Sequence, residues 1–126
     1  MSNQKKKVLV VDDEPHIFGI VQRYMETEDQ NVQVLQALDA RTGLNLVTDQ
    51  EPDIVVLDIM MPGMNGLEMC ETLRSTPETA HIPVIILSAK TSEDDIAAAY
   101  KAGANNYVTK PFSPIQLARL IKDMID

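Results

Sequence analysis

Short runs of four or five apolar residues alternate along this chain with stretches in which apolar residues recur every three or four positions. The short runs are typical of strands buried on both faces, and the other spacing is typical of helices with one buried face. Such strands run parallel when helices join them, because each helix returns the chain to the same end of the sheet. The alternation predicts an α/β fold with a doubly wound, five-stranded parallel sheet and five helices.

The predicted strands cover residues 7–11, 32–37, 54–57, 84–87 and 106–109. A helix is predicted after each strand: from Pro15, over 39–48, from Leu67 to near Pro77, from Thr91 or Ser92 to near Gly103, and from Ser113 onward. Capping residues and prolines mark these boundaries. We expect a single domain over residues 1–126, because the length suits one core and no linker or repeat interrupts the pattern.

The chain carries 11 basic and 19 acidic residues, which gives a formal net charge of −8. Phosphate backbones bind clustered cations, so this charge argues against direct binding to nucleic acid. No apolar run is long enough to span a membrane, and no secretory signal is visible. The lone cysteine, Cys70, excludes an internal disulfide. These features favour a soluble domain in the cytoplasm.

Charged or hydroxyl residues stand at the ends of four predicted strands. Asp12 and Asp13 follow the first strand, Asp58 the third, Ser88 the fourth and Lys110 the fifth. In a doubly wound sheet the carboxyl ends of the strands meet at one edge, and the functional crevice lies where the strand order reverses. We therefore expect these side chains to converge at that edge.

This set of side chains favours one kind of chemistry. Converging carboxylates repel, because two charges about 4 Å apart interact by roughly 4 kcal/mol at an effective dielectric of about 20. A cation relieves this repulsion, and an all-oxygen site with room for water favours Mg²⁺. A lysine and a hydroxyl nearby suit phosphoryl transfer, in which charge develops on the phosphoryl oxygens. Asp58 ends the central strand and is the expected nucleophile.

Five motifs in this order resemble the receiver domain of bacterial two-component response regulators. They are Val-Asp-Asp-Glu at 11–14, Leu-Asp-Ile-Met-Met-Pro-Gly-Met-Asn-Gly at 57–66, Leu-Ser-Ala at 87–89, Ala-Gly-Ala at 102–104 and Tyr-Val-Thr-Lys-Pro-Phe at 107–112. The resemblance extends from Val8 to Ile125. It implies a flavodoxin-like sheet with strand order 2-1-3-4-5.

The resemblance also implies a phosphoacceptor and a metal site. Asp58 takes a phosphoryl group from a histidine kinase or a histidine phosphotransfer protein. Asp12, Asp13, Asp58 and the backbone carbonyl of Met60 hold Mg²⁺. The domain then catalyses only its own phosphorylation and dephosphorylation, and it signals to a partner protein or to an effector domain. Whether the chain is a single-domain regulator or part of a longer one stays open.

Four further roles follow from the same resemblance. Lys110 pairs with a phosphoryl oxygen, and a cis peptide bond joins it to Pro111. Ser88 bonds the phosphoryl group through its hydroxyl, and Tyr107 swings inward when that hydroxyl moves. Met60 and Lys90 occupy the positions that tune the rate of phosphate loss, because attacking water must pass both.

The sequence disfavours three alternatives. A phosphatase of the haloacid dehalogenase type needs a second acid two residues after the nucleophile, and Met60 stands there. A flavin mononucleotide binder needs a phosphate loop after the first strand, but residues 12–15 are Asp-Asp-Glu-Pro. A degenerate receiver that serves only protein contacts is disfavoured by the complete set of acids, hydroxyl and lysine.

Overall fold

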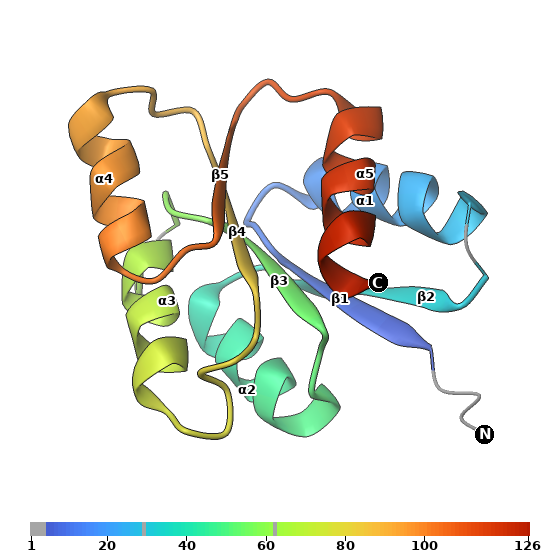
Figure 1. The fold of residues 1–126 in the computed structure, drawn as a ribbon, viewed down its shortest axis with the longest axis horizontal. Helices are drawn as coiled ribbons and strands as arrows, with labels where there is room; N and C mark the ends of the chain where they lie inside the picture. Colours follow the sequence, from blue (N-terminus) through green and yellow to red (C-terminus); the bar gives the residue numbers. More distant parts are fainter. Residues whose placement is uncertain (1–4, 29, 62) are drawn as a thin grey trace.

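The computed structural model describes residues 5–28, 30–61 and 63–126 (Figure 1). Pro62, which belongs to the motif at 57–66, lies outside the described residues. The strands are β1 (Lys6–Val11), β2 (Val32–Ala37), β3 (Ile54–Asp58), β4 (Val84–Ser88) and β5 (Asn106–Thr109). The helices are α1 (Pro15–Glu28), α2 (Ala40–Gln50), α3 (Gly66–Ser75), α4 (Glu93–Lys101) and α5 (Pro114–Ile125).

The strands form one parallel sheet in the order β2-β1-β3-β4-β5, so the predicted fold class and strand order are confirmed. From β1 the chain crosses to β2 on one side and then returns to β3 on the other side. The order therefore reverses between β1 and β3. Because Val11 pairs with Leu57, the strands β1 and β3 end side by side, and the residues that follow them share one edge of the sheet.

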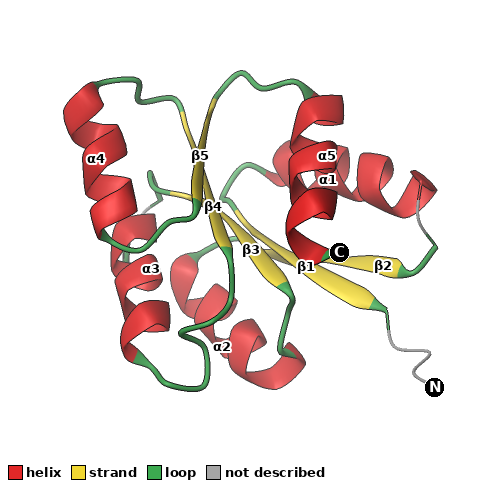
Figure 2. Cartoon of the chain, viewed as in Figure 1, coloured by secondary structure: helices red, strands yellow, loops and turns green. Residues whose placement is uncertain are grey.

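Helices cover both faces of the sheet, with α1 and α5 on one face and α2, α3 and α4 on the other (Figure 2). Alternate residues of each strand point to opposite faces. In β1, Leu9 and Val11 pack toward α2 and α3, while Val8 and Val10 pack toward α1 and α5. Cys70 is buried in the first of these two cores, where burial raises the pKa of its thiol. In the described part of the chain, no helix combines the length and the apolar character that a membrane crossing requires.

Side-chain caps fix where four helices begin. The caps are Asp39 for α2, Asn65 for α3, Ser92 for α4 and Ser113 for α5, and each accepts a hydrogen bond from the N–H three residues further on. The cap satisfies a backbone donor that has no partner within the helix. Of the two candidates for α4, Ser92 and not Thr91 is thus the cap. Each cap also ends the loop that leaves the sheet at its functional edge.

Candidate functional site

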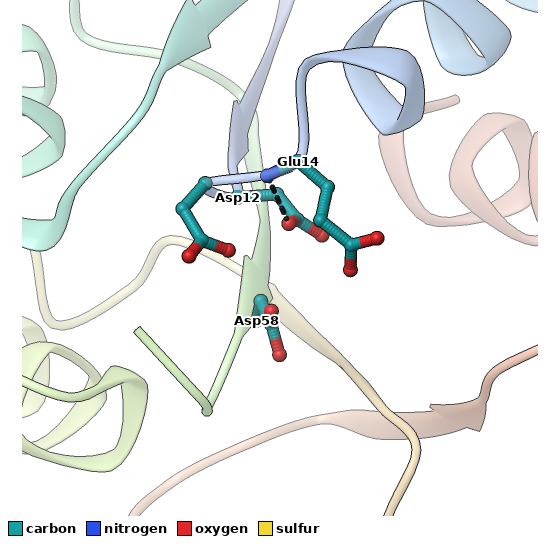
Figure 3. Close-up of side chains that lie close together, drawn as sticks. Asp12, Glu14 and Asp58 are labelled. Carbon is teal, nitrogen blue, oxygen red and sulfur yellow. Dashed lines mark hydrogen bonds between the residues drawn. The ribbon is translucent and has the colours of Figure 1, made fainter. Parts of the chain in front are cut away.

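Four carboxylates meet at the edge where the strand order reverses (Figure 3). Oxygen atoms of Asp12, Asp13, Glu14 and Asp58 all lie within 4.8 Å of one another. Asp12 and Asp58 are buried, with 2% and 4% of their surfaces exposed, whereas Asp13 and Glu14 are exposed. Two buried acids therefore form the floor of the site and two exposed acids form its rim.

The two buried carboxylates are oriented by the backbone that follows each strand. Asp12 accepts a hydrogen bond at Oδ1 from the N–H of Glu14 at 2.9 Å. Asp58 accepts one at Oδ1 from the N–H of Met60 at 3.1 Å. Both are local turns in which an aspartate binds the backbone two residues on. The Oδ2 atom of each carboxylate remains to face the rest of the site.

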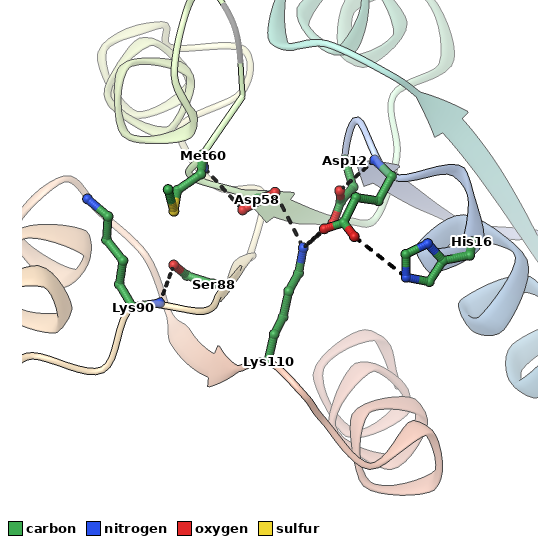
Figure 4. Close-up of polar contacts among 8 residues, drawn as sticks. Asp12, His16, Asp58, Met60, Ser88, Lys90 and Lys110 are labelled. Atoms are coloured by element: carbon green, nitrogen blue, oxygen red, sulfur yellow. Dashed lines mark hydrogen bonds and ion pairs between the residues drawn. The ribbon is translucent and has the colours of Figure 1, made fainter.

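The ammonium of Lys110 lies among three of these acids (Figure 4). Its Nζ is 2.9 Å from Asp12 Oδ2, 3.0 Å from Glu14 Oε1 and 3.4 Å from Asp58 Oδ2. Burial alone would lower the pKa of Lys110, but the hydrogen bonds to Asp12 and Glu14 and the charges of Asp12 and Asp58 outweigh it and raise that pKa. The same contact lowers the pKa of Glu14. Lys110 is therefore a fixed cation at this site.

The pKa of Asp58 is raised, although a nearby cation such as Lys110 ordinarily lowers the pKa of a carboxylate. Burial raises it and the negative charge of Asp12 adds to the rise, while the N–H of Met60 and the more distant Lys110 oppose it. The ammonium lies closer to Asp12 and Glu14 than to Asp58, so its charge offsets that of Asp58 least. Ionised Asp58 is thus incompletely compensated.

The donor set fits a hard divalent cation. One ammonium offsets only one of the four carboxylate charges, and the ligand atoms available are all oxygens. This combination suits Mg²⁺, which prefers oxygen ligands and retains water molecules. The contact found for Met60 is through its N–H, so its carbonyl stays a predicted ligand.

Ser88 and Tyr107 are both bonded to the backbone of Lys90. Ser88 is fully buried at the end of β4, and its Oγ accepts a hydrogen bond from the N–H of Lys90 at 3.0 Å. The hydroxyl of Tyr107 donates to the carbonyl of Lys90 at 2.8 Å. In addition, the N–H of Lys110 donates to the carbonyl of Ser88 at 2.8 Å. These three hydrogen bonds thus connect the end of β4 both to β5 and to the loop that follows β4.

Met60 and Lys90 lie on the Ser88 side of Asp58, across the site from Lys110 (Figure 4). Met60 is an exposed apolar residue, with 56% of its surface accessible. The Nζ of Lys90 is 3.9 Å from Asp95 Oδ1, in the first turn of α4, and its side chain is 45% exposed. The two side chains therefore border the access to Asp58 from this direction.

Sequence reasoning missed two features of the site. Glu14 appeared only within the motif at 11–14 and was not predicted as a site residue, but it is a direct partner of Lys110. Gly66 appeared only within the motif at 57–66, but it lies so close to β3 that a Cβ atom there would be 2.3 Å from the carbonyl oxygen of Asp58. A third acid directly after the aspartate pair was a signal for the first feature. No pattern in the sequence points to the second, because it depends on how α3 crosses the end of β3.

The Lys110–Pro111 peptide bond is cis, as the resemblance implied. The fold is the flavodoxin-like fold of signalling receivers, with the acidic cluster at its switch point. The family model for the response regulator receiver domain matches residues 8–122, so the chain belongs to this family. This membership favours the receiver prediction over the phosphatase and flavin-binding alternatives.

Solved structures of receivers are similar over nearly the whole chain. Chemotaxis protein CheY4 of Vibrio cholerae is 28% identical, with a TM-score of 0.85 over 95% of this chain and 98% of that one. The receiver domain of Francisella response regulator 1452 is 31% identical, with a TM-score of 0.86 over 96% and 97%. The receiver of a DNA-binding response regulator from Colwellia psychrerythraea is 26% identical, with a TM-score of 0.89 over 96% and 98%.

Proposed function

We propose that this chain is a phosphoacceptor in which Asp58 takes a phosphoryl group from a phosphohistidine of a histidine kinase or a histidine phosphotransfer protein. The observation that carries the proposal is the position of Asp58. It ends the central strand, it is buried, and its Oδ2 faces the Lys110 ammonium at 3.4 Å beside Asp12. A nucleophile there has a cation beside it and further acids close by that could hold a metal.

In the proposed reaction, a carboxylate oxygen of Asp58 forms a bond to phosphorus. The phosphorus–nitrogen bond of the donor histidine breaks, and its electron pair returns to the imidazole nitrogen. Mg²⁺, held by Asp12, Asp13, Asp58 and the Met60 carbonyl, would supply positive charge against the phosphoryl oxygens. Water later attacks the phosphorus of the acyl phosphate, the bond from phosphorus to the Asp58 oxygen breaks, and inorganic phosphate leaves as the carboxylate is restored.

Lys110 and Ser88 bind the new phosphoryl oxygens in this proposal. Lys110 is already charged and close to Asp58, so it needs only a short movement. A hydroxyl has one donor hydrogen and two acceptor lone pairs. The N–H of Lys90 uses an acceptor position of Ser88 Oγ, so the Ser88 hydrogen can be directed to a phosphoryl oxygen.

In this proposal, the conformational change that follows phosphorylation passes from Ser88 to Tyr107 by way of the Lys90 backbone. A movement of Ser88 toward the phosphoryl group strains its bond to the N–H of Lys90, and the carbonyl of Lys90 holds the Tyr107 hydroxyl. The orientation of Tyr107 thereby depends on the state of Asp58. Met60 and Lys90 limit the approach of water and slow the loss of phosphate.

Further parts of the proposal rest on the sequence and the family. Residues 1–126 act as a single receiver domain in the cytoplasm that catalyses only its own phosphorylation and dephosphorylation. It does not bind nucleic acid directly. Its output passes to a partner protein or to an effector domain.

Intact mass spectrometry tests the acceptor. With Mg²⁺ and acetyl phosphate, the wild type should gain one phosphoryl group, and Asp58→Asn should gain none. Asp49→Asn is the matched control, because Asp49 is an exposed acid on α2 and should leave the gain unchanged. Equal labelling of Asp58→Asn and wild type would rule out Asp58 as the acceptor.

A further inference from the structure

We propose that Glu14 is a positioning residue that holds the Lys110 ammonium in its resting place and competes with the phosphoryl group for it. The inference rests on the proposed role of Asp58. The Nζ of Lys110 lies 3.0 Å from Glu14 Oε1 but 3.4 Å from Asp58 Oδ2. In the unmodified protein the cation is therefore held nearer to a rim acid than to the acceptor.

The backbone fixes Glu14 for this contact. Its N–H is bound by Asp12 Oδ1 at 2.9 Å, and Asp12 Oδ2 binds the same ammonium at 2.9 Å. The other carboxylate oxygen of Glu14, Oε2, lies 3.7 Å from Nε2 of His16 in the first turn of α1 (Figure 4). The Glu14 carboxylate thus connects the loop after β1 to the lysine that follows β5.

The ammonium has no donor to spare. A lysine carries three N–H donors, and Lys110 faces three carboxylate oxygens. A phosphoryl oxygen can take a full hydrogen bond only when one of these carboxylates gives up its own. The Asp12 side chain is 1% exposed, so it cannot exchange this partner for water. The Glu14 side chain is 49% exposed and can do so.

The contact to Asp58 is the longest of the three, at 3.4 Å, and the phosphoryl group on Asp58 replaces it. The ammonium must still move toward that group, and of its two shorter contacts only the one to Glu14 can yield. That contact therefore stabilises the unphosphorylated arrangement. Replacing Glu14 should make Lys110 easier to recruit and should tighten the binding of a phosphoryl group. The Glu14 side chain is half exposed, so solvent screens its contact and the expected gain is modest, about two- to fivefold in affinity. The gain in affinity should depend on the length of the side chain at position 14 as well as on its charge.

Beryllofluoride with Mg²⁺ serves as the phosphoryl mimic, and its dissociation constant is measured by calorimetry. Glu14→Gln should bind the mimic about two- to fivefold more tightly than wild type. Glu14→Asp keeps the charge but draws the carboxylate back by one methylene, so it should also bind more tightly. Asp94→Asn, at an exposed acid in α4, removes the same charge elsewhere and should match wild type. Affinity for Mg²⁺ alone is measured separately for each variant.

A second measurement does not depend on the mimic. In metal-free protein, the ammonium protons of Lys110 should exchange with water faster in Glu14→Gln than in wild type, as followed by ¹⁵N NMR. If Glu14→Gln binds the mimic no more tightly than Asp94→Asn does, or if the exchange is unchanged, Glu14 does not restrain Lys110. If the wild type itself binds no mimic, the proposed function of Asp58 fails and the inference fails with it.

Discussion

The hydroxyl of Tyr107 donates a hydrogen bond to the backbone carbonyl of Lys90 at 2.8 Å. The N–H of the same lysine donates to Ser88 Oγ at 3.0 Å. One residue of the loop after β4 thus holds both side chains that are expected to respond to phosphorylation. The contribution of these hydrogen bonds to the order of the loop can be tested without changing Asp58.

Tyr107→Phe should loosen this loop while it keeps the ring packed on the core. A neutral hydrogen bond contributes about 0.5–1.5 kcal/mol, so amide exchange around Lys90 should accelerate by up to roughly tenfold. Hydrogen exchange measured by NMR provides the readout. Tyr100→Phe, at an exposed position of α4, is the control and should leave these amides unchanged. Unchanged exchange in Tyr107→Phe would mean that the bond does not restrain the loop.

Asp13→Asn should abolish Mg²⁺-dependent phosphorylation and raise the melting temperature of the metal-free protein by a few degrees. Asp13 is an exposed member of the carboxylate cluster, so its loss relieves repulsion but removes an expected ligand. Thermal melts in EDTA and in Mg²⁺ check both effects. A lower melting temperature in EDTA would contradict the repulsion argument.

Asp58→Asn should stabilise the metal-free protein at neutral pH, and the gain should shrink as the solution becomes acidic. Burial raises the pKa of Asp58, so the folded state binds this proton more tightly than the unfolded state does. The resulting cost to stability is absent below the unfolded pKa and grows as the pH rises through the folded pKa. Urea unfolding across the acidic range gives the difference between variant and wild type. A gain that is equal at every pH would contradict this origin.

Met60→Asn combined with Lys90→Glu should speed the loss of phosphate several-fold. Met60 cannot orient water, and Lys90 borders the same access to Asp58 while it pairs weakly with Asp95. Phosphoryl decay is followed by intact mass after the donor is removed. Lys101→Glu makes the same charge change at an exposed lysine on α4 and should decay at the wild-type rate. A double variant that decays no faster would show that these positions do not gate water.

Much of the site could be predicted, because strand ends are visible in the sequence and topology decides which ends meet. The predicted third and fourth strands stopped at Leu57 and Leu87, but pairing continues through Asp58 and Ser88, since the ladder depends on the backbone and not on apolar side chains. The partners of Lys110 could not be predicted. Which carboxylates Lys110 contacts depends on side-chain conformation, and hydrophobic periodicity carries no information about side-chain conformation.

Gly66 brings the start of α3 into direct contact with the backbone of the acceptor. The first residue of α3 rests directly on the Asp58–Ile59 backbone, where even one methyl group would collide with it, and its N–H is bonded to the carbonyl of Ile59 at 3.2 Å. A partner protein that displaced the start of α3 would press on the backbone of Asp58 and Ile59. Displacement of α3 would then reach the Asp58 carboxylate through the backbone, even if the side chains around that carboxylate stayed the same.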